Sequence, residues 1–415
     1  MRDVLFFLET SVTGNGPPFF ACARRLGLTP VLVSRHPTAF EHIADFEPLA
    51  VDAMDCATIV RAIDAFGRDR VAGVCSPLSQ WAERVAQVAE AIDRPHSSPE
   101  AVAICRDKFR TREVLAGAGI RDVAFRSAFS GLEAEAAAKD IGGVVIIKPR
   151  EASGATGVRI CHTPQEVRDH VDHFVRTMPR LAKFGVSIEE YIEGPQFGIE
   201  LFDLVPVAIR RKHISPPPAS IPIGLDCPPM DDPQICKMVE EHAIRATRAA
   251  GYERGPAHVE VRYGAKGPCI IEINPRIVGG VGAESVRLAF GVDLVEATIR
   301  FSCGMPYSLD RKFQRASATR YLLRRDIVAL DVTGQDDAMA VEGVSEVGVY
   351  AHALLRGGPA LNYMDRIAYV VSEGATTADA IKSADEGLRR LQIIPESSWG
   401  RAVRKMKKKV FAKEA

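Results

Sequence analysis

The sequence predicts a mixed α/β and α+β protein, for two reasons. First, short apolar runs of strand length alternate with helical segments over the first hundred residues. This alternation is typical of a parallel sheet with helices on its faces. Second, two later strand-like runs, His258–Tyr263 and Cys269–Ile273, are joined by a short segment centred near Lys266. Such a pair predicts an antiparallel hairpin. A chain of 415 residues is long enough for two or three domains.

The first hundred residues contain the clearest alternation. Three apolar runs are predicted strands: Val4–Leu8, Pro30–Ser34 and Val71–Cys75. Three segments with helical spacing of apolar residues are predicted helices: Phe19–Leu26, Ala57–Phe66 and Leu78–Ile92. Gly14-Asn15-Gly16 could seat an anion at a helix start. The full dinucleotide fingerprint is missing, however, which favours a simple turn. A polar, proline-flanked break at residues 94–99 predicts a domain boundary nearby.

The middle of the chain mixes helices and strands. Its predicted elements are the helix Arg106–Ala118, the strand Val144–Ile147, the helix Pro164–Met178 and the strand Val186–Ile192. The segment His213–Pro233 carries seven prolines, which predicts neither helix nor central strand. A loop this long in a compact domain is typically a lid or a disordered segment. We therefore expect it to lie over a substrate pocket, with an exposed linker as the alternative.

Composition narrows the possible partners. Lysine plus arginine equal aspartate plus glutamate at 53 each, so no net charge draws the chain toward nucleic acid or a membrane surface. The apolar runs are too short to span a bilayer, and no signal peptide is recognised. The nine cysteines are scattered without a C-x-x-C pair, which indicates a reducing cytoplasm and argues against structural zinc. We expect small-molecule partners in the cytoplasm.

Two carboxylates and an amide converge in the predicted hairpin. Strand alternation puts Glu272 and Asn274 on one face, and the turn places Glu260 opposite Glu272. Neighbouring carboxylates repel unless something positive lies between them. Oxygen ligands with room for water and phosphate favour Mg²⁺ over zinc. The alternative is a solvated strand, but the apolar residues around Glu272 indicate a buried sheet, where free carboxylates are costly.

A second candidate site follows the strand Val144–Ile147. Lys148 ends this strand, and a loop of small residues follows it, with backbone N–H groups and hydroxyls that could bind phosphates. The loop contributes Ser153, Gly154 and Thr156. It is not a Walker loop, because it lacks Gly-Lys-Ser/Thr. Further along, an extended segment from Glu189 stops at Gly194-Pro195 and could present backbone groups to an adenine ring.

In this order, the motifs resemble the ATP-grasp superfamily over residues 1 to 390. The motifs are Asp107-Lys108, Lys148 with its loop, Glu189-Glu190-Tyr191-Ile192-Glu193-Gly194, Glu260, and Glu272-Ile273-Asn274-Pro275-Arg276. The resemblance implies a Rossmann-like N-terminal domain (1–102), an ATP-grasp domain (103–306) and a small C-terminal α+β domain (307–415). The ATP-grasp domain would have a small lobe (103–185) and a large lobe (186–306). The C-terminal domain would pack on the ATP-grasp sheet.

The resemblance also implies roles for individual residues, with ATP and two Mg²⁺ ions, or Mn²⁺ in their place, as cofactors. Lys108 and Lys148 would bind phosphates. Adenine would be contacted by Glu189 and by the backbones of Glu190 and Ile192. Glu260, Glu272 and Asn274 would bind the metal ions. Gln196 stands where an acid usually binds ribose, and an amide can still hydrogen-bond the sugar hydroxyls. Arg276 would stabilise the acyl phosphate and the tetrahedral intermediate, with Lys148 and His258 as further catalytic residues.

The implied reaction is ATP-dependent amide formation, in which a carboxylate becomes an acyl phosphate and an amine displaces phosphate. Three stretches resemble the L-amino acid ligase branch: Leu8-Glu9-Thr10, Asn274–Gly280 and Asp365–Val371. Gly279 and Gly280 would let backbone approach an amino acid closely. Lys212 and His213 belong to a cationic cluster that suits an anionic substrate. A ligase for another carboxylate, as in siderophore assembly, and a non-catalytic nucleotide-binding module remain alternatives. A homodimer also stays open.

Overall fold

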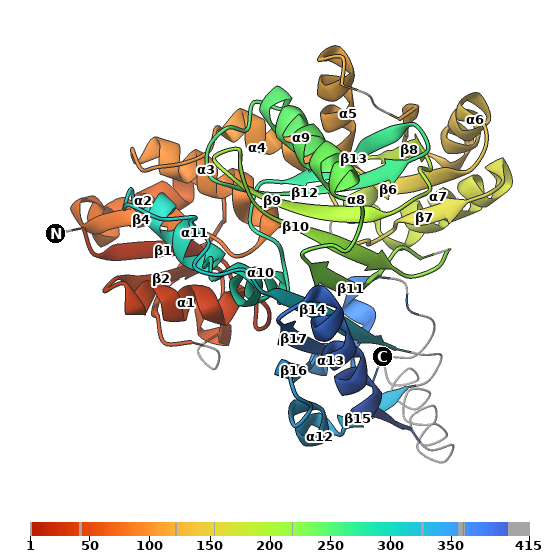
Figure 1. Ribbon diagram of the computed structural model, residues 1–415. Coiled ribbons are helices and arrows are strands. Elements are labelled where there is room, and N and C mark those ends of the chain that lie inside the picture. Colours follow the sequence, from red (N-terminus) through yellow and green to blue (C-terminus); the bar gives the residue numbers. More distant parts are fainter. Residues whose placement is uncertain are drawn as a thin grey trace, which may run out of the picture.

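The computed structural model describes residues 2–40, 44–120, 123–152, 154–217, 219–324, 328–355, 360 and 362–396. Three parts of the chain follow one another in sequence and meet at a common junction (Figure 1). In Figure 1 the N-terminal part is red to orange, a long green sheet lies in the centre, and the C-terminal strands are blue. Among the described residues, no helix is long and apolar enough to cross a membrane.

The N-terminal part is a parallel sheet, as predicted. Its strands are β1 (Val4–Leu8), β2 (Thr29–Ser34), β3 (Glu47–Ala50) and β4 (Val71–Cys75), in the order β3-β2-β1-β4. Its helices are α1 (Gly16–Arg25), α2 (Cys56–Gly67) and α3 (Ala82–Ala91). Every residue of β1 and β4 is buried, because both faces of a parallel sheet are covered. The short edge strand β3 is mostly exposed and was not predicted.

Two helices lead from this sheet to the next part of the chain. Ser98 caps α4 (Pro99–Arg106) by accepting a hydrogen bond from the Ala101 N–H. Asp107 caps α5 (Lys108–Gly117) by accepting from the N–H groups of Phe109 and Arg110. Such caps satisfy donors that have no partner inside the helix. The Asp107 cap therefore fixes where α5 begins, and with it the position of Lys108.

A small antiparallel sheet follows. Its strands are β5 (Phe125–Ala128), β6 (Val145–Pro149), β7 (Arg159–Cys161) and β8 (Val186–Glu190), in the order β5-β8-β6-β7. Its helices are α6 (Gly131–Ile141), α7 (Pro164–Thr177) and the short α8 (Pro179–Ala182). The apolar faces of α6 and α7 share one core with the buried residues of β6 and β8. This packing holds Lys148, at the end of β6, in a defined place.

The largest sheet has eight strands and is antiparallel throughout. Its order is β13-β12-β9-β10-β11-β14-β17-β16. The strands are β9 (Gln196–Phe202), β10 (Val205–Ile214), β11 (Pro222–Cys227), β12 (Pro256–Gly264), β13 (Gly267–Asn274), β14 (Ala316–Leu323), β16 (Val344–Val349) and β17 (Arg366–Gly374). The predicted hairpin is thus confirmed as β12 and β13.

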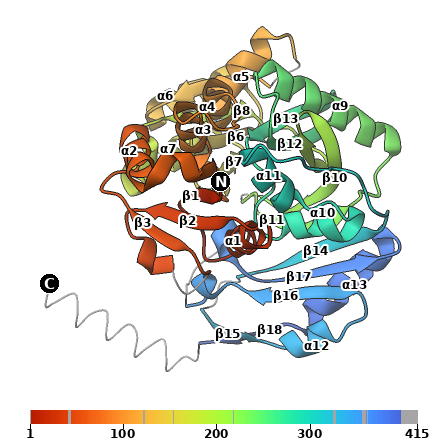
Figure 2. The same ribbon diagram turned by 90° about the vertical axis from the view of Figure 1, so that its left-hand side faces the viewer.

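Strands from beyond residue 306 continue this sheet without a break. β14, β17 and β16 extend it past β11 (Figure 2). A separate two-stranded sheet pairs β15 (Ala329–Thr333) with β18 (Gln392–Pro395). The remaining helices are α9 (Pro233–Ala249), α10 (Gly282–Phe290), α11 (Leu294–Ser302), α12 (Gln335–Met339) and α13 (Thr377–Arg390). The boundaries at residues 102 and 306 stay a prediction.

The prediction that the proline-rich segment His213–Pro233 forms a loop is wrong. His213 lies in β10, and β11 is an inner strand between β10 and β14. The prolines explain this, because Pro222 is the first residue of β11 and Pro228 follows its last residue. Proline is tolerated at the start of a strand, where it need not donate a ladder hydrogen bond. The interior of β11 has no proline, and the loops of the segment are the connection between β10 and β11 and residues 228–232, which lead to α9.

Candidate active site

A cavity of about 600 Å³ opens where the three parts of the chain meet. The small sheet, the large sheet, the N-terminal loop at residues 11–15 and the C-terminal strands all contribute to its walls. Most of the predicted site residues line it: Lys108, Lys148, Gly154, Glu189, Glu190, Ile192, Gln196, Lys212, His258, Glu260, Glu272, Arg276, Gly279 and Gly280. Segments far apart in the sequence are thus brought to one place.

Three predicted site residues do not line the cavity. The Asn274 side chain lies behind Glu272, because its Nδ2 donates a hydrogen bond of 2.9 Å to Glu272 Oε1. His213 points to the other face of the sheet, where its Nε2 is 2.6 Å from Asp226 Oδ2. Thr156 lies in the small-residue loop but outside the wall. The remaining candidate of this loop, Ser153, falls outside the described residues.

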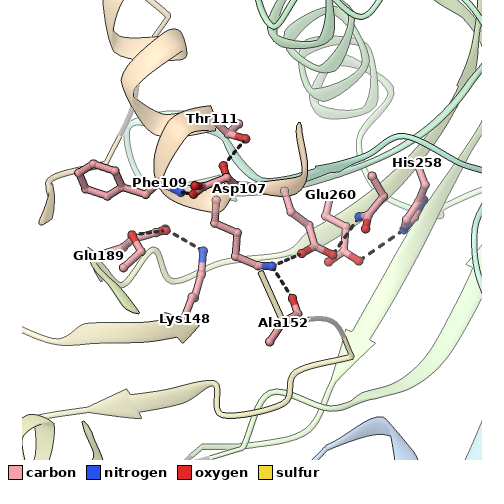
Figure 3. Close-up of polar contacts among 12 residues, drawn as sticks. Asp107, Phe109, Thr111, Lys148, Ala152, Glu189, His258 and Glu260 are labelled. Carbon is pink, nitrogen blue, oxygen red and sulfur yellow. Dashed lines mark hydrogen bonds and ion pairs between the residues drawn. The ribbon is translucent and has the colours of Figure 1, made fainter. Parts of the chain in front are cut away.

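Lys148 is held by a buried carboxylate. Its Nζ lies 2.7 Å from Glu189 Oε2 (Figure 3). Arg112 Nη2 lies 2.7 Å from the same oxygen. Burial raises the pKa of Glu189, but Arg112 and Lys148 lower it by more, so that the pKa falls to about 2. Burial lowers the pKa of Lys148, and Glu189 opposes this. The result is a rigid cluster of two cations on one ionised acid at the wall of the cavity.

Lys108 connects the small-residue loop to the acidic hairpin. Its Nζ donates a 2.7 Å hydrogen bond to the Ala152 carbonyl and lies 3.5 Å from Glu272 Oε2 (Figure 3). Asp107 pairs with Arg150, so the start of α5 is tied to the beginning of the same loop. From this position Lys108 lies close to the Glu272 carboxylate and to the loop that is predicted to bind phosphates.

The two predicted metal carboxylates lie directly opposite each other. Glu260 on β12 and Glu272 on β13 are register partners. The expected positive groups are present, because Glu260 pairs with Lys212 and lies 3.4 Å from His258 Nε2. Burial raises the pKa of Glu260, but Lys212 and His258 outweigh it and hold the pKa well below its usual range. Glu260 is thereby kept available as an anion.

These residues fit a magnesium site. Among the described residues, no group of three or more His, Cys, Asp or Glu side chains is arranged to hold a metal ion. The oxygen donors present are the two carboxylates of Glu260 and Glu272, with the amide of Asn274 beside Glu272. Mg²⁺ suits such a set, because it prefers oxygen ligands and commonly keeps waters and phosphate oxygens in its shell. Zinc sites in proteins are typically built with cysteine or histidine ligands.

A further buried acid, Glu200 on β9, was not predicted. It contacts His258, which lines the cavity. Its carboxylate pairs with Arg210, lies 2.6 Å from His258 Nδ1, and accepts a 3.1 Å hydrogen bond from the Val278 N–H. Burial raises the pKa of Glu200, but His258 and Arg210 lower it to about 2. Burial lowers the pKa of His258, yet Glu200 raises it more. The imidazolium form of His258 is therefore favoured.

The sequence carried signals for two of the missed residues. Arg112 follows Lys108 by four positions, which places both side chains on one face of α5. Arg210 and Lys212 alternate with Arg211 and His213 along β10, so the cationic cluster divides between the two faces of the sheet. Arg210 and Lys212 line the cavity. For Glu200 the sequence offered no signal, because its three partners come from separate segments.

The groups predicted to bind the nucleoside are hydrogen-bonded to other residues of the chain. Gln196 Nε2 donates to Glu260 over 2.7 Å, and its Oε1 accepts from Arg262 over 2.6 Å. The carbonyl of Ile192 accepts from Arg262 over 3.0 Å, and the Glu190 N–H donates to the Ala124 carbonyl over 2.8 Å. The adenine and ribose assignments stay predictions.

Comparison with known proteins gives a consistent result. The ATP-grasp domain matches residues 141–285. The uncharacterized protein y4rH of Sinorhizobium fredii (strain NBRC 101917 / NGR234) is 30% identical over 404 residues, covering 94% of this chain and 82% of that protein.

Two solved structures share the fold over nearly the whole chain. L-amino acid ligase from Bacillus licheniformis has a TM-score of 0.81 at 17% identity, covering 96% of this chain and 99% of that one. The biotin carboxylase domain of Hydrogenobacter thermophilus 2-oxoglutarate carboxylase, in complex with MgADP, has a TM-score of 0.66 at 20% identity, covering 95% and 91%. At these identities the likeness shows the fold alone. With the domain match and the long relative, the chain belongs to the ATP-grasp superfamily.

Proposed function

We propose that the chain is a carboxylate–amine ligase that activates an amino acid as an acyl phosphate and couples it to an amine. One observation carries the proposal: a single cavity of about 600 Å³ gathers two lysines, two opposed carboxylates and Arg276. A module that only bound a nucleotide would not need an arginine beside the metal carboxylates. The gathering of these groups supports phosphoryl transfer to a substrate in the same cavity.

The phosphate-binding role falls to Lys148 and Lys108. Lys148 is fixed by Glu189 at one wall, and Lys108 stands between the Ala152 carbonyl and Glu272. Lysines held in place beforehand can balance the charge of a transferring phosphoryl group without reorganising during the reaction. ATP with Mg²⁺ would supply the γ-phosphoryl group that turns a carboxylate into an electrophile. Glu260, Glu272 and Asn274 would hold the metal; two ions, with Mn²⁺ as a substitute, are part of the proposal.

Arg276 would act on the substrate side. It is the second residue after β13, lines the cavity, and donates from Nη1 to the Ile277 carbonyl over 2.7 Å. Among the described residues it forms no ion pair with a carboxylate. Its remaining donors can bind oxygens that gain charge when the amine attacks the acyl phosphate. The nitrogen forms a bond to the carbonyl carbon, the bond to the phosphate oxygen breaks, and the amine loses a proton.

Phosphate release tests this proposal directly. The full-length chain is incubated with ATP, Mg²⁺ and L-amino acids, singly and in pairs, and products are identified by mass spectrometry. We expect release that depends on amino acids, yields an amide and stops on chelation. Release that requires a different carboxylate would favour the siderophore type of ligase. Nucleotide binding without release for any carboxylate would favour the non-catalytic module.

Glu272→Ala sharpens the assay. We expect turnover to be lost while the fold persists, because removing one acid from a repulsive pair need not destabilise the chain. Glu284→Ala, which removes an acid of α10 that is paired only with Arg287, serves as the matched control. Full activity of Glu272→Ala would contradict the metal assignment.

A further inference from the structure

Arg366 is a cation of the cavity wall that the proposed reaction does not yet use. It is the first residue of β17 and lines the cavity. Two contacts hold it: its Nε donates to the Pro222 carbonyl over 2.9 Å, and its guanidinium carbon lies 3.9 Å from the centre of the Tyr321 ring. Stacking of this kind orients the planar guanidinium. The side chain is therefore held in place before any ligand arrives.

The terminal nitrogens of Arg366 have no partner within the described part of the chain. Neither an ion pair nor a further hydrogen bond to them is found among those residues. Apart from Arg276 and Arg262, the other cavity cations described above differ in this respect, because each faces a carboxylate: Lys108, Lys148, Lys212, Arg112 and Arg210. An oriented guanidinium with open donors suits a planar carboxylate, which it can bind through two parallel hydrogen bonds.

Tyr321 adds a second open group beside Arg366. The residue is only 5% exposed, yet its hydroxyl forms no hydrogen bond with any residue that the structure describes. The hydroxyl oxygen is not one of the buried side-chain atoms that lack a partner, so it is open to the cavity that Tyr321 lines, where a ligand can hydrogen-bond to it. The hydroxyl lies 3.7 Å from the position that a Cβ atom would take on Gly280, which has a positive φ of 64°. Tyr321 thus links Arg366 to the Gly279-Gly280 loop.

This part of the cavity wall lies next to Arg276 in the sequence. The loop that carries Gly279 and Gly280 begins three residues after Arg276, and it is braced from the N-terminal side by Asn15, whose Nδ2 donates to the Val278 carbonyl over 2.7 Å. A substrate that reaches from Arg276 toward Arg366 would pass along Gly280 and the Tyr321 hydroxyl. One cation would meet the reacting carbonyl, and the other would meet a second anionic group of the substrates.

We propose that Arg366 and Tyr321 bind the free carboxylate of the amine substrate, so that the nucleophile is itself an α-amino acid. This inference rests on the proposed ligase function. In amide formation the nucleophile's own carboxylate does not react and remains an anion in the site. Arg366 would neutralise this carboxylate and hold the amine at a fixed distance from the acyl phosphate. An amine without a carboxylate would leave the guanidinium and the tyrosine hydroxyl unpaired, and would be a poor substrate.

The test compares each nucleophile with its own C-terminal amide. With the most active pair from the phosphate-release assay, kcat/KM is measured for the L-amino acid and for the corresponding L-amino acid amide. In the unmodified chain we expect the amino acid to be preferred by roughly 10- to 100-fold, the usual worth of a charge-assisted hydrogen-bonded pair. In Arg366→Gln the ratio should approach one, through the KM of the amino acid. Tyr321→Phe should reduce the ratio by a smaller factor.

Three features make the outcome decisive. The ratio is measured within one variant, so a general loss of folded protein cancels. Arg366→Lys keeps the charge and should retain part of the preference, whereas Arg315→Gln removes an arginine that pairs with Glu373 outside the cavity and should change nothing. An unchanged ratio in Arg366→Gln overturns the inference while leaving the ligase function intact. Absence of release from any amino acid pair in the unmodified chain overturns the function itself.

Discussion

The two sides of the cavity differ in whether protein carboxylates neutralise their cations. On the side of α5, β6 and β8, Lys148 and Arg112 share the buried carboxylate of Glu189. On the side of β14, β17 and the loop after β13, no described carboxylate lies within ion-pair distance of Arg276 or Arg366, although Glu272, Glu200 and Glu260 act on Arg276 over a longer range. A buried cation is costly unless something pairs with it. The first side therefore carries its counter-charge in the protein, and the second side leaves that place to the substrate.

This difference separates binding from chemistry. Cations that are already paired stay in place and offer a fixed electrostatic environment to phosphates. Cations that lack a partner interact strongly only when negative charge appears beside them. Substitutions on the first side should therefore affect stability as well as nucleotide binding. Substitutions on the second side should affect turnover and selectivity.

The largest effect among the substitutions on these two sides is expected at Arg276. Arg276→Ala should lower kcat by about 10²- to 10³-fold, because the charge it meets develops during the reaction. ATP affinity should change far less. The measurement pairs steady-state kinetics with nucleotide binding by calorimetry, and Arg287→Ala in α10 is the control. If ATP affinity fell as much as kcat, Arg276 would belong with the phosphate-binding cations instead.

An intermediate effect, this time on stability, is expected at Glu189. Glu189→Gln leaves Lys148 and Arg112 buried beside a neutral amide, which should cost about 3–5 kcal/mol of unfolding free energy. Urea unfolding at pH 7 measures this cost, with Glu241→Gln on α9 as an exposed control. A variant as stable as the parent would show that the two cations do not depend on Glu189.

The same residue predicts a pH dependence. The pKa of Glu189 is about 2 in the folded chain, below its ordinary value of 4.5. Its stabilising contribution is therefore complete above pH 4.5 and is lost as the pH falls through the folded value near 2. The difference in unfolding free energy between the parent and Glu189→Gln should shrink as the pH is lowered from 5 toward 2. A difference that stayed constant over this range would rule out ionised Glu189 as its cause.

The smallest effects distinguish the two faces of β10. Lys212 pairs with Glu260 in the cavity, whereas His213 pairs with Asp226 on the other face. Lys212→Gln should lower activity by about tenfold and alter amino acid preference, because Glu260 loses a charged partner. His213→Gln should leave both nearly unchanged. Profiling the same amino acid panel with both variants checks this, and a larger effect of His213→Gln would show that the outer face also shapes the site.

Residue order alone determined several features of this protein. Alternating apolar runs were enough to predict β1, β4 and a parallel N-terminal sheet, because a buried strand flanked by turns leaves a local signature. The hairpin of β12 and β13 followed from two short runs and a glycine-flanked turn, and the position of that turn correctly placed Glu260 opposite Glu272. These features depend on neighbours within a few residues or across one turn.

Tertiary structure decided what no local pattern could show. The proline-rich segment became an inner strand because its prolines lie at the ends of β11, where partners from β10 and β14 complete the ladder. Glu200 gathers His258, Arg210 and the Val278 N–H from three separate segments. Arg366 lies some ninety residues beyond Arg276 and reaches the cavity only because β17 joins the same sheet. Whether a charge is paired depends on which distant strand lies beside it, and that is settled only when the chain folds.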